Sequence, residues 1–446
     1  MSPARRRVAV IGAGWAGLAA AVQAVTDGAE VTVIEMAAHP GGRARSVDIG
    51  DDVRLDNGQH ILIGAYAETL RLMQVIGVVP SHVMHRRRLE LLYPDGSGLA
   101  LPSGPVHLAF ARAVATARGW TWRERIGLLR QATMWLLRGM RNPGVGTVDE
   151  LCSGLPARVR TDLIDPLCIA ALNTPAHQAD ATVFLRVLAD ALFGAPGSSD
   201  LLLPTAGLSR LFPAPAVDWL MRQRAHLQWG QRVMRLERDD DDARWAIDGI
   251  AYDAIVLACS AAEAARLLAP IDPEWSQTAA EFRYEPIATI YLRRGDVPLA
   301  RPMVALRSTP AQPAQFAFDL ALLEQHARVV AFVVSGASAW LEEGMPRLIT
   351  AIQGQAAQAL PDSFGPAAEV VHAAFERRAT FACTPGLRRP RHAIAPGLLV
   401  AGDFVEGPYP ATLEGAVRAG VRAARQAASS ASAVPNQASR MQNLVP

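Results

Sequence analysis

The feature that most constrains the fold is a glycine-rich turn between an apolar strand and a helix near the N-terminus. Val8-Ala9-Val10-Ile11 is a continuous apolar run of the kind buried in a parallel sheet. Gly12-Ala13-Gly14-Trp15-Ala16-Gly17 follows at once with G-x-G-x-x-G spacing. The first glycine permits a tight turn, the second lets the backbone approach a pyrophosphate, and the third lets helix and strand pack closely. The sequence therefore predicts an α/β fold that begins with a Rossmann-type dinucleotide-binding unit.

An acidic residue completes this unit at the end of the next strand. Val31-Thr32-Val33-Ile34 reads as that strand, and Glu35 closes it. A carboxylate at this position accepts hydrogen bonds from a ribose diol, and the first amides of the preceding helix attract phosphate. The residues expected to contact the dinucleotide here are Gly12, Gly14, Trp15, Ala16, Gly17, Glu35 and Met36.

Two further motifs indicate FAD in place of a nicotinamide nucleotide. Gly41-Gly42-Arg43-Ala44-Arg45 resembles the segment that flavoprotein amine oxidases and carotenoid desaturases lay along the flavin pyrophosphate, where arginine offers paired donors. Gly402-Asp403 follows a buried strand, and Pro410 to Ala416 leads into a helix, which resembles the closing motif of the same superfamily. The resemblance implies that Asp403 lies near the ribityl phosphate and that the helix N-terminus, at Thr412 and Leu413, faces the flavin ring.

The middle of the chain adds one more expected contact with the cofactor. Arg232-Val233-Met234 resembles the strand whose backbone contacts the adenine, and Val233 is the residue expected to make that contact. No cysteine, histidine or tyrosine is marked by the sequence as a covalent flavin anchor. We therefore expect FAD to be bound non-covalently.

The layout of the chain is interleaved. Residues 1–85, 205–265 and 390–428 are predicted to form a discontinuous FAD-binding domain, with the turn-forming run Asp239 to Asp242 inside the second part. Residues 86–204 are predicted to form a helical lobe, with helices over 106–141 and 157–193, breaks at Pro166 and at Asn173-Thr174-Pro175, and a loop from Gly194 to Gly207. Residues 266–389 form a mixed α+β lobe with strand-like runs at 287–292 and 329–334, and 429–446 a polar, disordered tail.

Composition narrows the class of partner and the compartment. The formal net charge is +2, which does not suggest nucleic acid. All 44 basic residues are arginine, so no lysine is available to form a Schiff base or to hold a water beside a flavin. The four cysteines, Cys152, Cys168, Cys259 and Cys383, have no metal-ligand spacing and are expected to be reduced core residues in the cytoplasm, with no metal bound. No stretch reads as a transmembrane helix.

The substrate class comes from a second resemblance. Leu55-Asp56-Asn57-Gly58-Gln59-His60-Ile61-Leu62-Ile63-Gly64-Ala65-Tyr66 is similar to the signature of the squalene-associated flavoproteins of hopanoid pathways, the hydroxysqualene dehydroxylases. The similarity continues at residues 166–175, 183–185, 199–204 and 211–216 and spans most of residues 8–425. It implies a polyisoprenoid substrate and reductive conversion of hydroxysqualene to squalene, with squalene-synthase-like enzymes as pathway partners.

That reaction needs a proton donor near the flavin. Protonation of an allylic hydroxyl and loss of water leave a delocalised cation that can accept hydride. His60 is the candidate donor because its segment is expected to run past the flavin, together with Gly58 and Gln59. His60 as a packing residue, and Gln59 as the residue that orients a water, both stay open. Tyr409 is a candidate for the substrate pocket, with simple packing as the alternative.

The region from Val106 to Arg141 suggests contact with a membrane. It carries Trp120, Trp122 and Trp135 among Arg112, Arg118, Arg123, Arg125, Arg130, Arg138 and Arg141. Tryptophan with arginine suits the interface of an anionic membrane, and an ordinary amphipathic helix is the alternative. The first interpretation places the protein on the inner face of the cell membrane as a peripheral protein.

Three other functions share parts of this pattern. A carotene-type desaturase has the same fold, flavin and substrate class but runs oxidatively. An amine oxidase often uses a lysine-held water, which this chain cannot supply. A non-catalytic flavin-binding lipid carrier or assembly partner would show no reoxidation of reduced flavin by substrate.

Overall fold

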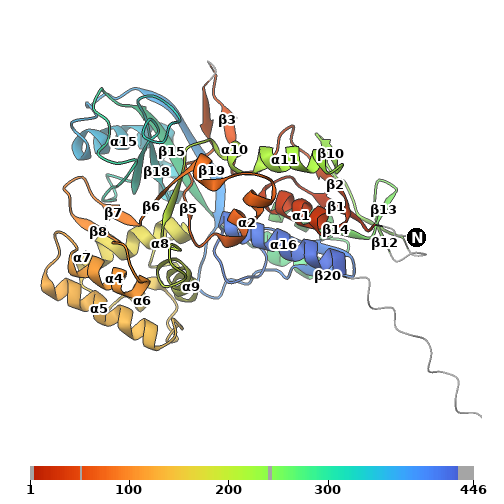
Figure 1. Ribbon diagram of the computed structural model, residues 1–446, viewed down its shortest axis with the longest axis horizontal. Coiled ribbons are helices and arrows are strands. Elements are labelled where there is room, and N and C mark those ends of the chain that lie inside the picture. The colour runs from red at the N-terminus through yellow and green to blue at the C-terminus, as the bar shows by residue number, and fades with distance from the viewer. Residues whose placement is uncertain (1–4, 51–52, 240–243, 430–446) are drawn as a thin grey trace, which may run out of the picture.

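The centre of the molecule is a parallel sheet built from segments far apart in the sequence. The computed structural model describes residues 5–50, 53–239 and 244–429. Five parallel strands and one antiparallel edge strand lie in the order β10-β2-β1-β14-β21-β20 (Figure 1). Their bounds are β1 Arg7–Ile11, β2 Glu30–Glu35, β10 His226–Trp229, β14 Ala254–Leu257, β20 Ala393–Ala395 and β21 Leu398–Val400. The α/β class predicted from the sequence is confirmed.

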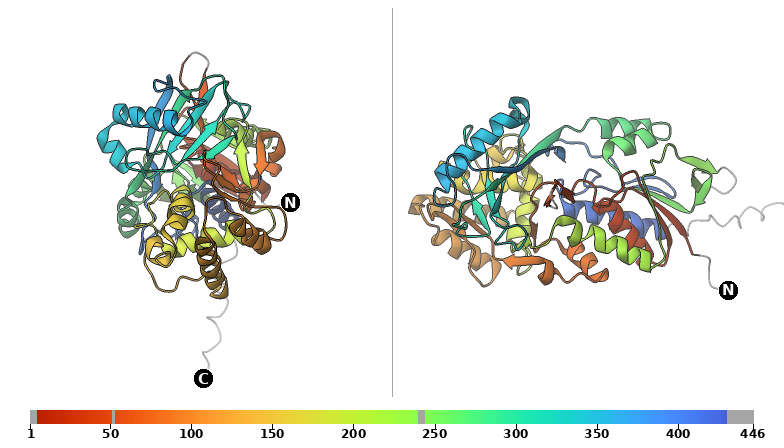
Figure 2. Two further views of the ribbon diagram at one scale, coloured as in Figure 1. Left: turned by 90° about the vertical axis from the view of Figure 1, so that its left-hand side faces the viewer. Right: turned by 90° about the horizontal axis from the view of Figure 1, so that it is seen from above.

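Helices cover both faces of this sheet because its strands are apolar on both sides. On one face lie α1 (Trp15–Thr26), α16 (Leu413–Ser429) and α11 (Pro213–Arg222), and Figure 2 shows α12 (Ala261–Leu268) and α13 (Pro273–Ala280) on the other. Small residues let α1 and α16 approach closely, since a Cβ on Gly420 would lie 2.1 Å from the Ala16 carbonyl oxygen. The chain thus brings its first and last helices side by side.

The mixed lobe is an antiparallel sheet with one face covered by helices. Its strands β15 (Tyr284–Arg293), β16 (Met303–Ala305), β17 (Phe316–Asp319), β18 (Val329–Val334) and β19 (Val370–Phe381) lie in the order β16-β17-β18-β15-β19. Helices α14 (Ser338–Glu343) and α15 (Met345–Ala359) cover the outer face, where Phe332, Leu348 and Ile352 are fully buried. The strand-like runs at 287–292 and 329–334 are confirmed within β15 and β18.

The helical lobe departs from the predicted helix boundaries. It contains α4 (Val106–Ala115), α5 (Trp122–Leu137), α6 (Val148–Leu151), α7 (Ala157–Val159), a π-helical turn at Arg160–Ile164, α8 (Asp165–Leu172) and α9 (Ala181–Leu192). The helix predicted over 106–141 is broken at 116–121, where Gly119 has φ +81° and Thr121 begins α5 in a capping box with Glu124. The break predicted at Pro166 is absent, because the chain stays helical from the π-helical turn into α8. The Asp162 carbonyl oxygen, which the missing amide of Pro166 cannot serve, accepts from the Tyr93 hydroxyl at 3.0 Å.

Residues 194–207 are only partly a loop. Leu201–Pro204 forms β9, which pairs with β5 (Leu62–Ile63) and β6 (Met84–Arg87), so backbone pairing overrides the glycine and proline content around it. The remaining elements are α2 (Ala67–Val75), α3 (Pro80–Val83), α10 (Leu208–Leu211), β3 (Ser46–Asp48), β4 (Arg54–Asp56), β7 (Glu90–Leu92), β8 (Gly98–Ala100), β11 (Glu237–Asp239), β12 (Arg244–Ile247) and β13 (Ile250–Tyr252). Most of the Asp239–Asp242 run and, after Ser429 at the end of α16, the predicted tail lie outside the described residues.

Two of the three tryptophans expected at a membrane interface belong to the core. Trp120 and Trp135 are 5% and 3% exposed, whereas Trp122 is 69% exposed. Arg125 is also committed to the fold, because it donates to the Ala117 carbonyl and lies over the Trp122 ring. No helix among the described residues is long and apolar enough to cross a membrane. Any membrane-facing surface in this region must therefore consist of the residues that are exposed, and Trp120 and Trp135 are not among them.

A buried asparagine ties the helical lobe to the mixed lobe. Asn173 ends α8 in the left-handed conformation, with φ 48°. Its side-chain amide donates to the Glu285 carbonyl and to Thr380 Oγ1, both at 3.0 Å, and its oxygen accepts from the Gly336 amide at 2.7 Å. One side chain thus joins α8 to β15, to β19 and to the turn after β18.

Replacement of this asparagine should lower the stability of the whole molecule. Asn173→Ala removes the partner of the part-buried Glu285 carbonyl and of the part-buried Gly336 amide, and a group left unpaired away from water costs roughly 1–3 kcal/mol. We expect a loss of about 3 kcal/mol in the free energy of unfolding, measured by urea titration. Gln358→Ala, on the exposed side of α15, is the matched control and should change stability by less than about 0.5 kcal/mol. An Asn173→Ala variant as stable as that control would show that Asn173 does not stabilise the contact between the two lobes.

Candidate functional site

A single large cavity runs from the parallel sheet into the space between the other two lobes. Its volume is about 750 Å³, in the upper part of the range of roughly 300–1,000 Å³ that ligand sites occupy. The predicted residues that line it are Gly12, Gly14, Trp15, Ala16, Glu35, Met36, Gly41, Gly42, Arg43, Ala44, Gly58, Gln59, His60, Val233, Gly402, Asp403, Tyr409, Thr412 and Leu413. Of the predicted set, Gly17 and Arg45 are not on the cavity wall.

The three glycines of the first loop differ in what surrounds them. Gly12 has φ +108°, which only glycine adopts readily, and a Cβ on Gly17 would lie 1.9 Å from the Gly12 carbonyl oxygen. Gly14 differs from both, because a Cβ there would meet nothing of the protein closer than the Gly42 Cα at 4.0 Å. Gly12 and Gly17 are therefore required by the fold, and Gly14 faces open space in the cavity. This open space at Gly14, the cradle, lets a ligand come close to the protein backbone.

The same loop presents an anion site. Gly14 precedes α1, and neither a side-chain cap nor an acidic residue occupies the first turn of that helix. Gly41 and Gly42, with φ +106° and +60°, turn against the loop, and the Gly41 amide donates to the Ala13 carbonyl at 2.8 Å. The helix N-terminus thus faces the cavity with its amides and positive dipole end available. These groups fit the pyrophosphate of a dinucleotide.

Glu35 lies beside this loop and is already bonded to it. Its carboxylate accepts from the Ala13 amide at 2.6 Å and from the Ala37 amide at 2.8 Å. Each carboxylate oxygen can accept a further hydrogen bond, and Glu35 lines the cavity, so the pair of oxygens suits a ribose diol. Glu35 therefore shapes the phosphate loop and offers acceptors to the ribose.

Loss of this carboxylate should weaken cofactor binding more than it weakens the fold. Glu35→Gln keeps the size of the side chain and removes its charge, and a hydrogen bond to a charged group contributes about 1.5–3 kcal/mol. We expect the dissociation constant for FAD, measured by titration of the apoprotein, to rise roughly tenfold to hundredfold. Glu30→Gln, at the exposed start of the same strand, is the control. An unchanged constant would remove Glu35 from the ribose site.

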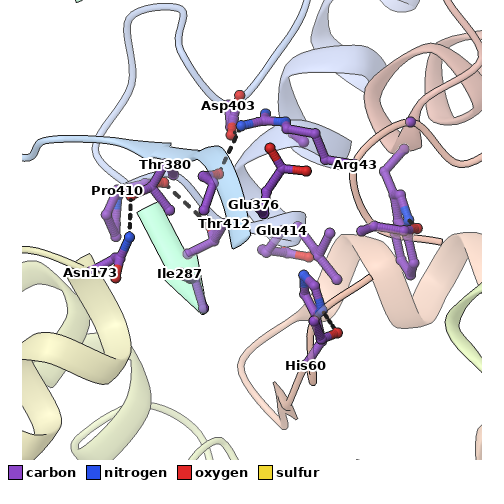
Figure 3. A pocket seen from close by; sticks show the side chains of 18 of the residues that line it. Arg43, His60, Asn173, Ile287, Glu376, Thr380, Asp403, Pro410, Thr412 and Glu414 are labelled. Atoms are coloured by element: carbon purple, nitrogen blue, oxygen red, sulfur yellow. Dashed lines mark hydrogen bonds and ion pairs between the residues drawn. The ribbon is translucent and has the colours of Figure 1, made fainter. Parts of the chain in front are cut away.

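Arg43 makes contacts that the sequence did not indicate. Its guanidinium pairs with Asp403 at 2.7 Å and donates to the carbonyl oxygens of Arg378 and Ala379 at 3.0 and 2.8 Å. The Asp403 carboxylate raises the pKa of Arg43 further above its ordinary value. Arg43 therefore joins the segment from Gly41 to Arg45 to β19 and to the Gly402-Asp403 turn (Figure 3). Its pairing with phosphate stays a prediction, and Arg45 donates to the Gly42 carbonyl instead of lining the cavity.

The closing segment places a second helix N-terminus at the cavity. Thr412 caps α16, because its Oγ1 accepts from the Gly415 amide at 3.1 Å. The Glu414 carboxylate is turned away from the cavity centre and accepts from the Glu68 and Thr69 amides at 3.0 Å, which caps α2. The first amides of α16 consequently face the cavity beside Thr412 and Leu413. They fit the negatively charged edge of a reduced flavin.

His60 lies on the cavity wall with one ring nitrogen committed. Its Nδ1 is 2.8 Å from the Gly58 carbonyl oxygen, so Nδ1 carries the hydrogen, and Nε2 has no hydrogen-bond partner in the described part of the chain (Figure 3). Burial lowers the pKa of His60 below its ordinary value, which favours the neutral ring. The ring in this state accepts a proton or a hydrogen bond at Nε2. His60 can therefore donate a proton only after it receives one from another group.

Asp56 is a group that the sequence analysis did not single out. It is 6% exposed, and its Oδ1 accepts from Ser46 Oγ at 2.7 Å and from the Leu208 amide at 2.9 Å. Its Oδ2 is buried and has no hydrogen-bond partner among the described residues. Burial raises the pKa of Asp56. A negative charge on Asp56 raises the pKa of His60 and so opposes the effect of burial on that ring. The only available signal was the similarity motif itself, which includes Asp56 four residues before His60.

The far half of the cavity is apolar. Helices α8 and α9 form one wall, and the uncovered face of the mixed sheet forms the other. The apolar side chains are Leu167, Ala170, Ala171, Phe184, Val187, Leu188, Ile287, Met303, Phe316, Phe318 and Val333. Such a lining binds hydrocarbon and leaves the few polar groups near Asp56 and His60 to orient it.

Two predicted residues differ in detail from their expected roles. Tyr409 lines the cavity and is held between Arg186 and Arg418, whose guanidinium carbons lie 5.5 and 5.3 Å from the ring centroid. Val233 lines the cavity, but Arg232-Val233-Met234 is not a strand. The Arg266 guanidinium donates to the carbonyl oxygens of Val233 and Met234, which are the groups that a neighbouring strand would otherwise bond.

The chain matches the family model of flavin-containing amine oxidoreductases over residues 15–428. Among curated proteins it is 27% identical to a hydroxysqualene dehydroxylase of Sinorhizobium fredii, covering 94% of this chain and 97% of that one. A hydroxysqualene dehydroxylase of Rhodopseudomonas palustris is 28% identical with the same coverage. A phytoene dehydrogenase of Streptomyces griseus is 28% identical over 56% of this chain and 53% of that one.

Solved structures share the architecture. An oxidoreductase from Methanosarcina mazei superposes with a TM-score of 0.72 at 15% identity, covering 94% of this chain and all of that one. A putrescine oxidase superposes with a TM-score of 0.69 at 18% identity, covering 95% and 99%. These likenesses establish the fold, and the cavity described above occupies the same architecture.

Proposed function

The chain belongs to the flavin-containing amine oxidoreductase family, and from that premise we propose that it is an FAD-dependent hydroxysqualene dehydroxylase. The observation that carries the proposal is one cavity with a dinucleotide cradle at one end and an apolar chamber at the other. Relatives that match over nearly the whole chain bear the name hydroxysqualene dehydroxylase. The family name alone does not imply an amine as substrate, and the chain has no lysine to hold a water beside the flavin.

The cofactor site would be filled by FAD, with residues already in place for each part of it. Glu35 would hold the ribose, the amides after Gly12 and Gly14 the pyrophosphate, and the N-terminus of α16 the ring edge. When bound and reduced, FAD supplies a hydride. We expect the flavin to be non-covalent, so heat or acid should release it from the protein.

The reaction needs one proton in addition to the hydride. The substrate C–O bond breaks, the hydroxyl takes a proton and leaves as water, and the carbon takes the hydride. We propose that Asp56 and His60 hold this proton together. Burial raises the pKa of the Asp56 carboxyl, whose Oδ2 has no hydrogen-bond partner among the described residues, so this carboxyl is the group that would give the proton to the leaving hydroxyl. Nε2 of His60 would accept a hydrogen bond from the same hydroxyl and hold it in place. Gln59, next to His60 on the cavity wall, is then left to orient the hydroxyl or a water.

Product analysis tests this function against its alternatives. Purified enzyme would be incubated without oxygen with hydroxysqualene and a chemical flavin reductant, and the products separated by chromatography. Squalene is the expected product. A carotene-type desaturase would leave hydroxysqualene unchanged. In a second assay, with oxidised flavin and a polyene precursor, such an enzyme would form new conjugated double bonds. An unchanged substrate in both assays would favour a lipid carrier.

A further inference from the structure

The outer face of α4 and α5 is apolar although it lies in solvent. Leu108, Trp122, Ile126, Met134 and Leu137 are exposed by 69%, 69%, 61%, 39% and 83%. They are five of the twelve large apolar side chains that are exposed in the described part of the chain, and all five fall within thirty consecutive residues. Exposed apolar residues grouped in this way mark an interaction surface.

Helix geometry shows that this is a true second face of α5. At 3.6 residues per turn, Trp122, Ile126 and Leu137 lie within about 60° of one another around the axis. The buried residues Leu128, Ala132 and Trp135 lie on the opposite side. An ordinary amphipathic helix has one apolar face, so the outer face of α5 needs a partner.

Charge identifies the kind of partner. Residues 105–146 contain seven arginines and one acidic residue, Glu124, while the rest of the chain contains 37 arginines and 41 acidic residues. Glu124 is occupied in the capping box at Thr121. Six exposed arginines of this stretch have no ion-pair partner among the described residues: Arg112, Arg118, Arg123, Arg130, Arg138 and Arg141. Apolar side chains ringed by unpaired arginines match an anionic lipid surface.

The position of this face relates it to the cavity. Figure 1 shows α4 and α5 at the end of the molecule far from the N-terminus, beside α8 and α9. The first of these helices packs on the end of α9, where His107 and Phe110 lie 5.6 and 5.2 Å from Phe193, measured between ring centroids. Leu192, the neighbour of Phe193, lines the cavity. Contacts through Phe193 therefore connect α4, the helix that carries Leu108, to the wall of the apolar chamber.

We propose that this face, defined by Leu108, Trp122, Ile126, Met134 and Leu137 and the six exposed arginines near them, docks on an anionic lipid bilayer. The apolar residues enter the interface, and the arginines bind headgroup phosphates. The step in which a hydrocarbon passes from the bilayer to the chamber rests on the proposed function. The docking itself does not, because it depends only on this surface.

Sedimentation of the FAD-loaded enzyme with lipid vesicles tests the docking without any substrate. We expect binding to vesicles that contain phosphatidylglycerol, weaker binding as salt rises, and little binding to pure phosphatidylcholine. The triple variant Arg123→Gln, Arg130→Gln, Arg138→Gln should bind about a hundredfold more weakly, since each basic residue near the surface contributes roughly fivefold. The flavin absorbance should be unchanged in that variant.

A second variant separates the apolar contribution from charge. Trp122→Ser, Ile126→Ser, Leu137→Ser should lose binding at least tenfold. The matched control Val79→Ser, Ile250→Ser, Val297→Ser removes comparably exposed apolar residues elsewhere and should bind like the wild type. Equal, salt-insensitive binding to both vesicle types would overturn the proposal. So would an apolar variant that binds like the control, or an absence of vesicle binding together with a dimer in light scattering that the same variant abolishes.

Discussion

Gly14→Val should yield a folded protein without flavin. Of the three glycines in the loop, Gly14 alone has room for a Cβ within the protein, with the Gly42 Cα at 4.0 Å as its nearest neighbour. Its φ of −73° also suits valine, so the fold does not require glycine here. The added side chain would instead occupy the space into which the pyrophosphate must come, and near-complete loss of bound FAD is the expected result.

Flavin content and circular dichroism, measured together on purified protein, check this expectation. Gly354→Val, on the exposed face of α15 with nothing near its Cβ, is the matched control and should retain full flavin. Gly17→Ala should differ from both, since its Cβ would collide with the Gly12 carbonyl and unfold the loop. A Gly14→Val protein that keeps its full complement of flavin would show that the cradle is not the pyrophosphate site.

His60→Ala and Asp56→Asn should each retain FAD and slow the oxidation of reduced flavin by hydroxysqualene. General acid catalysis contributes about 10²–10⁴-fold, and the effects should not add if the two residues hold one proton together. Stopped-flow measurement of the flavin signal in the two single variants and the double variant gives the comparison. Loss of FAD in His60→Ala would point to a packing role, and rates within threefold of the wild type would assign the proton to a water, with Gln59 as a residue that orients it.

The pH profile gives a readout that a merely structural role would not change. Burial raises the pKa of Asp56 and lowers that of His60, and the reaction consumes the proton that the pair holds. The rate should therefore be highest at low pH and fall as pH rises through the pKa of the pair. Asp56→Asn, which cannot lose a proton, should flatten this fall.

The cofactor half of the site was predictable because its residues obey local rules. The strand, the turn glycines and the acid at Glu35 lie within thirty residues, and each has a backbone reason that the sequence displays. The cavity confirms that these segments meet the closing motif at Asp403 and Thr412. The pairing of Arg43 with Asp403 was not predictable, because the two residues lie 360 positions apart in the sequence.

Burial within the helical lobe could not be predicted from composition. Trp120, Trp122 and Trp135 look alike in the sequence, but the break at Gly119 and the capping box at Thr121 set the rotation of α5. That rotation places Trp135 inside and Trp122 outside. The Thr121-x-x-Glu124 pattern was the local signal that could have located the start of this helix. Asp56 was missed for another reason, since an unpartnered buried oxygen is a property of packing and not of sequence.

A single-turnover measurement tests the central claim most directly. The enzyme would be reduced without oxygen until all its FAD is in the reduced form, and then mixed with one equivalent of hydroxysqualene. The account predicts that the oxidised flavin spectrum returns and that one squalene forms for each flavin reoxidised. A flavin that stays reduced while hydroxysqualene is recovered unchanged would contradict it.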